Sequence, residues 1–313
     1  GKLGPALPRP PLVPSAKMSD KPAGGNAMKE TVRGLVGNLG ALAILGGLGK
    51  ATGLGKFALL SLGLQWGVYL VHGLPYMSEK FYDASGSVTY LSLVLYALLE
   101  QSEHGTRQII NAVCVVIWFS RLGSFLFARI LKDGRDDRFT ALKKNVLRFL
   151  AAWTIQALWV WLVVLPVLIV VTSPTGSSAV GVLDVVGWCM WIIGFLIEVI
   201  ADAQKGAFRE KAENRGKFIC EGLWAYSRHP NYFGEILLWI GLCVSGSSCF
   251  VGKQWLGWLS PVFTYFLLTR VSGVPMLERK AEKTWGSQAD YQHYVRVTPC
   301  LVPAITRPLA HRP

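Results

Sequence analysis

The sequence predicts an all-α fold, a polytopic membrane bundle of about seven transmembrane helices. Hydrophobic residues make up 51% of the 313 residues and charged residues only 16%, against about a quarter in a typical soluble domain. The mean hydropathy is +0.36. This balance excludes intrinsic disorder over the whole chain and disfavours a standard soluble enzyme. The 12 Trp and 14 Phe residues suit a protein whose aromatic rings lie at membrane interfaces.

The N-terminal stretch, residues 1–56, is expected to be disordered or weakly ordered. Residues 1–30 are rich in Pro, Gly and Ala and carry five basic and two acidic residues, so a targeting remnant is one interpretation. Residues 35–56 are rich in glycine, but their GLGKATGLGK string matches neither phosphate-loop pattern. We therefore expect a flexible or interfacial segment there.

The remaining residues, 57–313, are expected to form one transmembrane domain. Its apolar runs cover about residues 57–73, 88–100, 108–131, 147–172, 180–201, 236–251 and 255–271. A helix needs roughly 20 apolar residues to cross a bilayer, and the third, fourth and fifth runs reach that length. The other runs are short, so some of them are expected to tilt or to enter as hairpins.

The formal net charge of +13 comes from basic residues that are concentrated in particular loops between these runs. Loops 132–148 and 202–235 hold six Lys/Arg each and the tail from Arg270 holds seven, whereas residues 172–183 hold none. The positive-inside rule then places the C-terminus and the basic loops on the cytosolic side. The organelle stays open, with the endoplasmic reticulum favoured for a eukaryotic chain. No soluble basic module is present, which argues against nucleic-acid binding. Scattered Cys and His residues argue against a disulfide scaffold or a metal site.

Charged residues inside the predicted spans are the first functional candidates. Arg121 and Arg129 lie two turns apart on the third run, and Glu198, Asp202 and Lys205 share one face at the end of the fifth. Ionisable groups in spans are costly and usually face a partner or a cavity. Two interpretations follow: these groups pair with one another across helices, or they line a polar cofactor cavity.

The string GLWAYSRHPNYFGE (222–235) is the most specific motif of the chain. Together with EKFYDASGSVTY (79–90) and RLGSFLFARILKDGRDDRF (121–139), it resembles steroid 5-alpha-reductase-like membrane proteins. The wider superfamily includes sterol C=C reductases, which use NADPH, and isoprenylcysteine carboxyl methyltransferases, which use S-adenosylmethionine. The resemblance implies a cofactor-binding C-terminal half, about residues 198–303.

NADPH is the cofactor that the basic residues favour. Its phosphates require several Arg or Lys donors, whereas S-adenosylmethionine needs far fewer. The stretch supplies Lys205, Arg209, Lys211, Arg215, Lys217 and Arg228, of which Lys211 and Arg215 are expected to be solvated bystanders. Asp202 and Asn214 are candidates for ribose or amide contacts, and His229 for a cofactor contact or an interfacial histidine. The resemblance implies that Glu198, Asp202, Asn231, Tyr232 and Glu235 line the cofactor.

The expected reaction is reduction of a polarised C=C bond in a lipid-like substrate, which enters from the surrounding membrane lipids. A tyrosine would serve as the acid; Tyr232 is the first candidate and Tyr82, beside Asp83, the second. Steroid 5-alpha-reductases carry a tyrosine shortly before an arginine on an early span, whereas residues 117–121 here are Ile-Trp-Phe-Ser-Arg. The substrate is therefore open. Two alternatives remain, an S-adenosylmethionine-dependent membrane methyltransferase and a non-enzymatic protein with a vestigial site.

Overall fold

A computed structural model describes residues 24–133 and 136–306, and over these ranges the chain is helical, without β-strand. The helices are α1 (Gly24–Thr52), α2 (Gly55–Val68), α3 (Leu74–Tyr76), α4 (Tyr82–Leu99), α5 (Thr106–Asp133), α6 (Val146–Thr172), α7 (Val182–Glu210), α8 (Pro230–Ser247), α9 (Leu259–Phe266), α10 (Gly273–Trp285) and α11 (Ala289–Val297). The predicted all-α class is confirmed.

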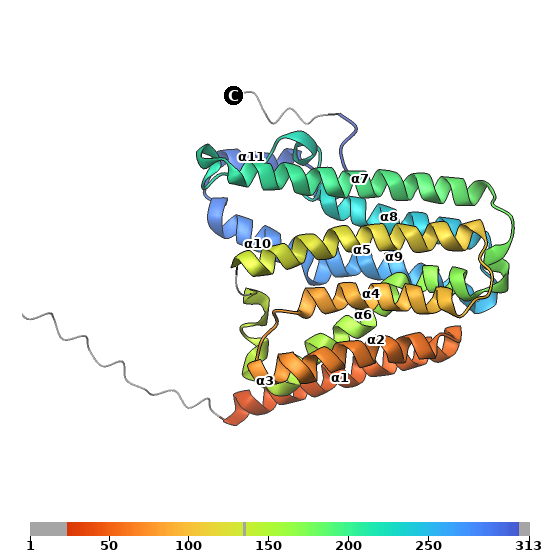
Figure 1. Ribbon diagram of the computed structural model, residues 1–313. Coiled ribbons are helices and arrows are strands. Elements are labelled where there is room, and N and C mark those ends of the chain that lie inside the picture. The colour runs from red at the N-terminus through yellow and green to blue at the C-terminus, as the bar shows by residue number, and fades with distance from the viewer. Residues whose placement is uncertain (1–23, 134–135, 307–313) are drawn as a thin grey trace, which may run out of the picture.

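The long helices lie side by side in one bundle, with α6 at its centre (Figure 1). Helix α6 packs against α1, α2, α4, α5, α8 and α9. Nearly all its side chains from Trp153 to Val171 are buried, which explains why this run is apolar on every side. Helices α7 and α8 form a closely packed pair at one edge of the bundle, whereas α1 and α2 lie at the opposite edge.

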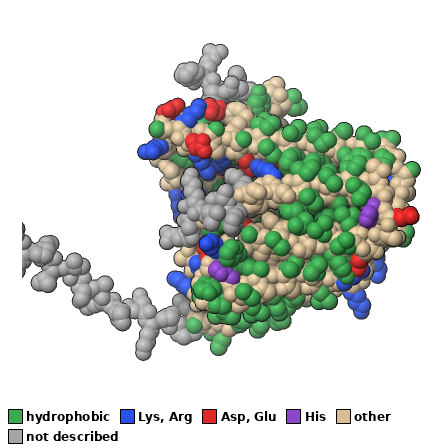
Figure 2. All heavy atoms as spheres, viewed as in Figure 1, with side chains coloured by type: hydrophobic (Ala, Val, Ile, Leu, Met, Phe, Trp, Pro, Cys, Tyr) green, Lys and Arg blue, Asp and Glu red, His purple; other side chains and the backbone are tan. Residues whose placement is uncertain are grey.

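Four helices of the described ranges are long and apolar enough to cross a membrane by length and composition: Ala27–Thr52, Gly55–Tyr76, Val146–Thr172 and Val182–Glu210. Hydrophobic side chains cover the long side of the bundle, and charged side chains gather at its ends (Figure 2). The membrane character is therefore supported. The count of about seven transmembrane helices is not confirmed, since the expected span at 108–131 in α5 is not among the four.

The N-terminal segment differs from the expectation. Residues 24–52, expected to be disordered or weakly ordered, form helix α1, which packs against α6. Asn38 Nδ2 donates to Leu147 O at 2.9 Å, and a Cβ at Gly34 would lie 2.7 Å from the backbone of Arg148. The glycines thus permit close helix packing, a role that they commonly have in membrane bundles. The expected targeting remnant falls largely on residues 1–23, which lie outside the described residues.

Glycines also form the contact between α7 and α8. A Cβ at Gly194 would lie 2.6 Å from Gly234 O, and a Cβ at Gly241 would lie 2.4 Å from Gly187 O. The pairs Gly187–Gly241 and Gly194–Gly234 repeat after seven residues on each helix, which is two helical turns. We call these four residues the glycine seam. It brings the two backbones into direct contact and fixes how the polar residues beyond it face one another.

The basic segments share one end of the bundle. The connections from α5 to α6 and from α7 to α8 lie at the end where α10 and α11 are also found (Figure 1). Most residues expected to form the functional site belong to these connections or to the adjoining helix ends. The fold therefore gathers them in one region.

Candidate functional site

A buried network of charged residues joins α5, α7 and α8. Arg121 Nη1 donates to Glu198 Oε1 at 2.5 Å, and Arg121 Nη2 also bonds Asp202. Asn231 Nδ2 donates to Asp202 Oδ1 at 3.1 Å. The Glu198 side chain is 3% exposed and that of Arg121 20%. The interpretation that these groups pair across helices is correct for Arg121, Glu198 and Asp202. The side chain of Arg129, expected on the same face, lies outside the described ones.

A second feature is a cavity of about 330 Å³ at the end of α7. It is enclosed by the end of α7, the connection to α8, and helices α10 and α11, and we call it the basic cavity. Five cationic side chains line it: Lys205, Arg209, Lys217, Arg228 and Lys280. Six aromatic side chains also line it: Phe208, Phe218, Trp224, Trp285, Tyr291 and Tyr294. Such a combination suits a ligand that carries both phosphate groups and flat rings.

Hydrogen bonds hold the connection between α7 and α8 against both helical walls. Trp224 Nε1 donates to Ala201 O at 2.9 Å, and Lys205 Nζ lies 4.3 Å from the Trp224 ring centroid. Tyr294 Oη on α11 donates to Trp224 O at 2.8 Å. Trp285 Nε1 on α10 donates to Gly216 O at 2.5 Å. The C-terminal helices are therefore part of the cavity wall.

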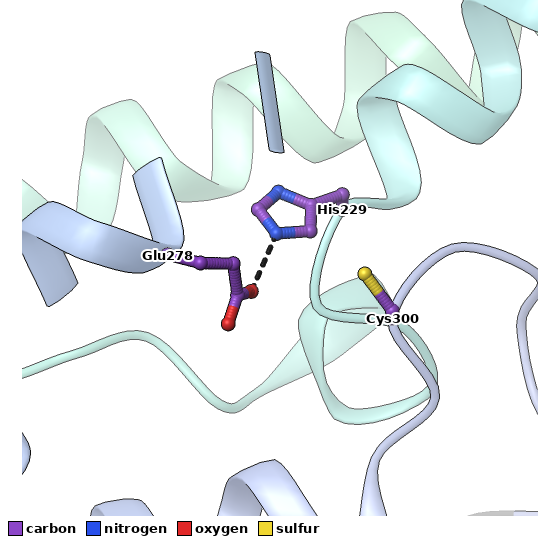
Figure 3. Close-up of side chains that lie close together, drawn as sticks. All are labelled: His229, Glu278 and Cys300. Atoms are coloured by element: carbon purple, nitrogen blue, oxygen red, sulfur yellow. Dashed lines mark hydrogen bonds and ion pairs between the residues drawn. The ribbon is translucent and has the colours of Figure 1, made fainter. Parts of the chain in front are cut away.

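Glu278 of α10 binds the two basic residues that precede α8, and Figure 3 shows its contact with one of them, His229. Its Oε1 lies 2.7 Å from His229 Nε2, and its Oε2 accepts from Arg228 Nη1 at 3.0 Å. The ligand atoms of His229, Glu278 and Cys300 all lie within 4.8 Å of one another, a spacing that a metal ion could bridge. Arg228 already neutralises Glu278, however, and four more cations line the same cavity. The region therefore suits an anionic ligand better than a metal cation.

The pKa values of this cluster are shifted downward. Burial lowers the pKa of His229, and the hydrogen bond to Glu278 offsets only part of that effect. Burial raises the pKa of Glu278, but the His229 hydrogen bond and the Arg228 charge outweigh it, so the pKa lies below its ordinary value. A neutral His229 thus donates from Nε2 to the carboxylate. This leaves Nδ1 as an acceptor.

Acidification is expected to destabilise this cluster. Both folded-state pKa values lie below their ordinary values, so the unfolded chain binds more protons and stability falls as the pH falls. The decline should begin near pH 6.5, where an unfolded histidine takes up its proton. Thermal midpoints measured between about pH 7.5 and pH 4.5 test this. In the variant H229Q, the fall of the thermal midpoint just below pH 6.5 should disappear. An unchanged pH profile in H229Q would contradict the assignment.

Four polar atoms near the basic cavity and the charged network are buried without a hydrogen-bond partner. They are Glu198 Oε2, Arg228 Nε, His229 Nδ1 and Asn231 Oδ1. Buried polar groups are almost always paired in folded proteins, so such atoms mark places where a ligand or water completes the bonding. One donor and three acceptors are available here.

The predicted site residues fall into three groups. Lys205, Arg209, Lys217, Arg228 and His229 line the basic cavity, and Glu198, Asp202 and Asn231 belong to the charged network. Glu235 lies on α8 one turn after Asn231 and lines a separate, smaller cavity. The others are placed elsewhere: Asn214 Nδ2 donates to Phe208 O at 2.9 Å at the end of α7, and Lys211 and Arg215 are exposed and do not line the basic cavity.

The two tyrosines proposed as acids lie in different surroundings. The Tyr232 ring stacks on His229, with the ring centroids 5.6 Å apart. Tyr82 Oη donates to Ala152 O at 3.1 Å, and its ring packs against Phe139 and Trp153. Tyr82 therefore joins α4 to α6 in an aromatic cluster away from the basic cavity.

Helices α10 and α11 lie within the cofactor-binding half implied by the resemblance, about residues 198–303, but none of their residues was predicted individually. Lys280, Trp285 and Tyr291 line the basic cavity although they follow the recognisable motif by more than 40 residues. The alternation of apolar and charged residues over 274–285 is the available signal, since it gives a helix with one apolar face. In the sequence alone, the charges of this tail are indistinguishable from the positive-inside pattern.

Comparison with known proteins places the chain in a family. A stretch of 82 residues is 33% identical to the Bos taurus protein "3-oxo-5-alpha-steroid 4-dehydrogenase 1", covering 26% of this chain and 30% of that protein. No solved structure shows a significant match. Residues 59–298 match the family described as "Protein of unknown function (DUF1295)". The chain therefore belongs to the DUF1295 family, in agreement with its resemblance to steroid 5-alpha-reductase-like membrane proteins.

Proposed function

We propose that the protein is a membrane-bound, NADPH-dependent reductase of a polarised C=C bond in a lipid-like substrate. The observation that carries this proposal is the basic cavity, in which five cations and six aromatic rings surround about 330 Å³ beside unpartnered buried polar atoms. The partial similarity to a protein named as a steroid 4-dehydrogenase supports the reaction class. The apolar flanks of the bundle suit a substrate that arrives from membrane lipids.

The residues divide the task of holding NADPH. Arg209, Lys217 and Lys280 would neutralise its phosphates, and the rings of Trp285 and Tyr291 would pack against its base. His229 Nδ1 and Asn231 Oδ1 accept hydrogen bonds, as hydroxyl or amide groups of the cofactor require.

The charged network forms the inner end of the proposed site. Arg121 holds the carboxylates of Glu198 and Asp202 in place, and Asp202 in turn accepts from Asn231. NADPH would supply the hydride. The protein would orient the reactants and exclude water between the helices.

The number of cations separates this proposal from the alternatives. S-adenosylmethionine carries a sulfonium and no phosphate, so a cavity with five cations suits it less well. A vestigial site would bind neither compound. We further propose that the C-terminus and the basic loops face the cytosol, where NADPH is available to the basic cavity.

Removal of two exposed lysines tests the cofactor assignment. In K217A/K280A the NADPH dissociation constant is expected to rise about 10- to 100-fold, because each charged hydrogen bond contributes about 1.5–3 kcal/mol and exposure reduces that value. Both lysines are exposed, so folding should be unaffected. Thermal stability of the detergent-purified protein is measured against NADPH, NADH and S-adenosylmethionine; a ligand at 100 times its dissociation constant adds about 2.7 kcal/mol.

The matched control is K211A/R215A, which removes the same charge from exposed positions outside the cavity. Its NADPH dissociation constant should stay within about twofold of the native value, since only long-range screened charge is lost. Equal weakening in both variants would attribute binding to net charge and not to the cavity. Stabilisation by S-adenosylmethionine alone would replace the reductase proposal with the methyltransferase.

A further inference from the structure

A second, smaller cavity lies among α4, α5, α6 and α8. Its volume is about 60 Å³. Of the motif residues 222–235, only Glu235 lines it. It shares no lining residue with the basic cavity. A water molecule takes about 30 Å³ in the liquid, so the cavity accommodates one small polar group but not the body of a lipid.

Two buried polar side chains on this cavity have an oxygen without a hydrogen-bond partner. Tyr90 on α4 is 6% exposed and Gln156 on α6 is 5% exposed. Tyr90 Oη and Gln156 Oε1 are both buried and unpartnered. Gln156 Nε2 donates to Tyr82 O at 3.0 Å, which fixes the amide so that Oε1, an acceptor, is the free atom. Gly86 gives the amide room, because a Cβ there would lie 2.6 Å from Gln156 Nε2.

The free atoms define the chemistry of the missing partner. Tyr90 Oη can donate a hydrogen bond, whereas Gln156 Oε1 can only accept one. A hydroxyl group accepts from one and donates to the other. A carbonyl oxygen would satisfy Tyr90 but leave Gln156 Oε1 unpaired, which is costly at a buried position. Trp118 Nε1, a donor on the same wall, is also buried without a hydrogen-bond partner, and a hydroxyl oxygen can accept from it as well as from Tyr90. The wall also includes Trp159 and the carboxyl groups of Asp83 and Glu235.

We propose that this cavity binds the hydroxyl group of an apolar lipid, with Tyr90 donating a hydrogen bond to the hydroxyl oxygen and Gln156 Oε1 accepting a hydrogen bond from the hydroxyl group. The inference rests on the proposed function in taking this lipid as the substrate of the reductase. The position of the cavity supports that link, because Glu235 lies one helical turn from Asn231 in the charged network. The lipid hydroxyl would then lie one turn along the same face of α8 from Asn231.

The test compares lipids that differ only in their oxygen function. The full chain in detergent receives cholestanol, cholestan-3-one or cholestane, and in a second set 2-hexadecanol, 2-hexadecanone or hexadecane; binding is read from thermal stability. In at least one set the alcohol should bind roughly tenfold more tightly than both the ketone and the hydrocarbon. Absence of any preference for the alcohol in both sets overturns the proposal.

Two variants separate the roles of the two side chains. Q156M should remove the preference for alcohol over ketone, whereas Y90F should weaken the alcohol and the ketone by similar factors. Y82F is the matched control, since Tyr82 does not line this cavity. If Q156M does not fold, the native preference and the Y90F pattern still decide the matter. An alcohol preference that persists in folded Q156M overturns the assignment.

NADPH binding is measured in the same samples. An NADPH dissociation constant within about twofold of the native value in Y90F and Q156M, together with loss of alcohol binding, supports the assignment. If the native chain binds NADPH but shows no preference for the alcohol, the hydroxyl site is overturned and the proposed function is not. If NADPH fails to stabilise the native chain, the proposed function fails, whatever the lipids do.

Discussion

Replacing Arg107 with methionine is expected to lower the free energy of unfolding by about 3–5 kcal/mol, because a buried carboxylate then loses its partner. Arg107 Nε and Nη2 donate to the two oxygens of Asp184 at 2.6 and 2.8 Å. The two side chains are 1% and 0% exposed. Arg107 also donates to Ser178 Oγ at 2.8 Å and to Ala179 O at 2.9 Å. It therefore ties the start of α5 to the start of α7.

Denaturation of detergent-solubilised protein, followed by circular dichroism, measures this loss. The double variant R107M/D184L should recover a large part of it, since two apolar side chains can replace a buried ion pair at little cost. R33M is the control: Arg33 pairs with Glu30 at the surface with 69% of its side chain exposed, so the change should stay below about 1 kcal/mol. An equally small effect of R107M would show that the pair does not stabilise the fold.

A valine at Gly194 is expected to separate α7 from α8 and to abolish NADPH binding. Overpacking of a well-packed site typically costs about 1–3 kcal/mol and occasionally more. Here the new Cβ would meet the backbone itself, 2.6 Å from Gly234 O and 2.7 Å from Leu238 N, so the cost should reach or exceed the upper value. The variant should fail to purify as a folded protein or should melt at a much lower temperature.

The same helix supplies the control for this prediction. A Cβ at Gly206 of α7 would meet nothing within 4 Å, and alanine is favoured over glycine in a helix by roughly 0.5–1 kcal/mol. G206A should therefore be as stable as the native protein or slightly more stable, with unchanged NADPH binding. Comparable losses in G194V and G206A would mean that α7 tolerates no side chain at either glycine, and the close contact in the glycine seam would then not explain the effect.

The sequence predicted part of the charged network because two of its residues follow helical spacing. Glu198 and Asp202 are four residues apart and so share a face of α7. Asn231 and Glu235 were implied by the family resemblance, and they show the same spacing on α8. Arg121 was recognised because a charge in an apolar run requires a partner. Which partner it takes depends on how three helices pack, and spacing along one helix does not contain that information.

Helix α1 and the small cavity could not be predicted from the sequence, each for a different physical reason. The glycines of helix α1 favour a flexible segment, because glycine weakens helices in water. In lipid, however, the backbone groups must bond internally, and glycine permits close helix packing. Tyr90 belongs to a stretch that resembles the family, but only the tertiary structure places it beside Gln156, 66 residues further along the chain. Long-range proximity of this kind leaves no periodic pattern.

The absence of shared lining residues between the two cavities bears on how this family could diversify. Residues of α4, α5 and α6 form most of the wall of the small cavity, whereas the end of α7 with α10 and α11 forms the basic one. If the two cavities are the lipid and nucleotide sites proposed above, substitutions in the first half of the chain would change which lipid is accepted without disturbing the nucleotide site. The α7–α8 pair, locked by its glycines, would keep the two reactants at a constant distance while the substrate changed.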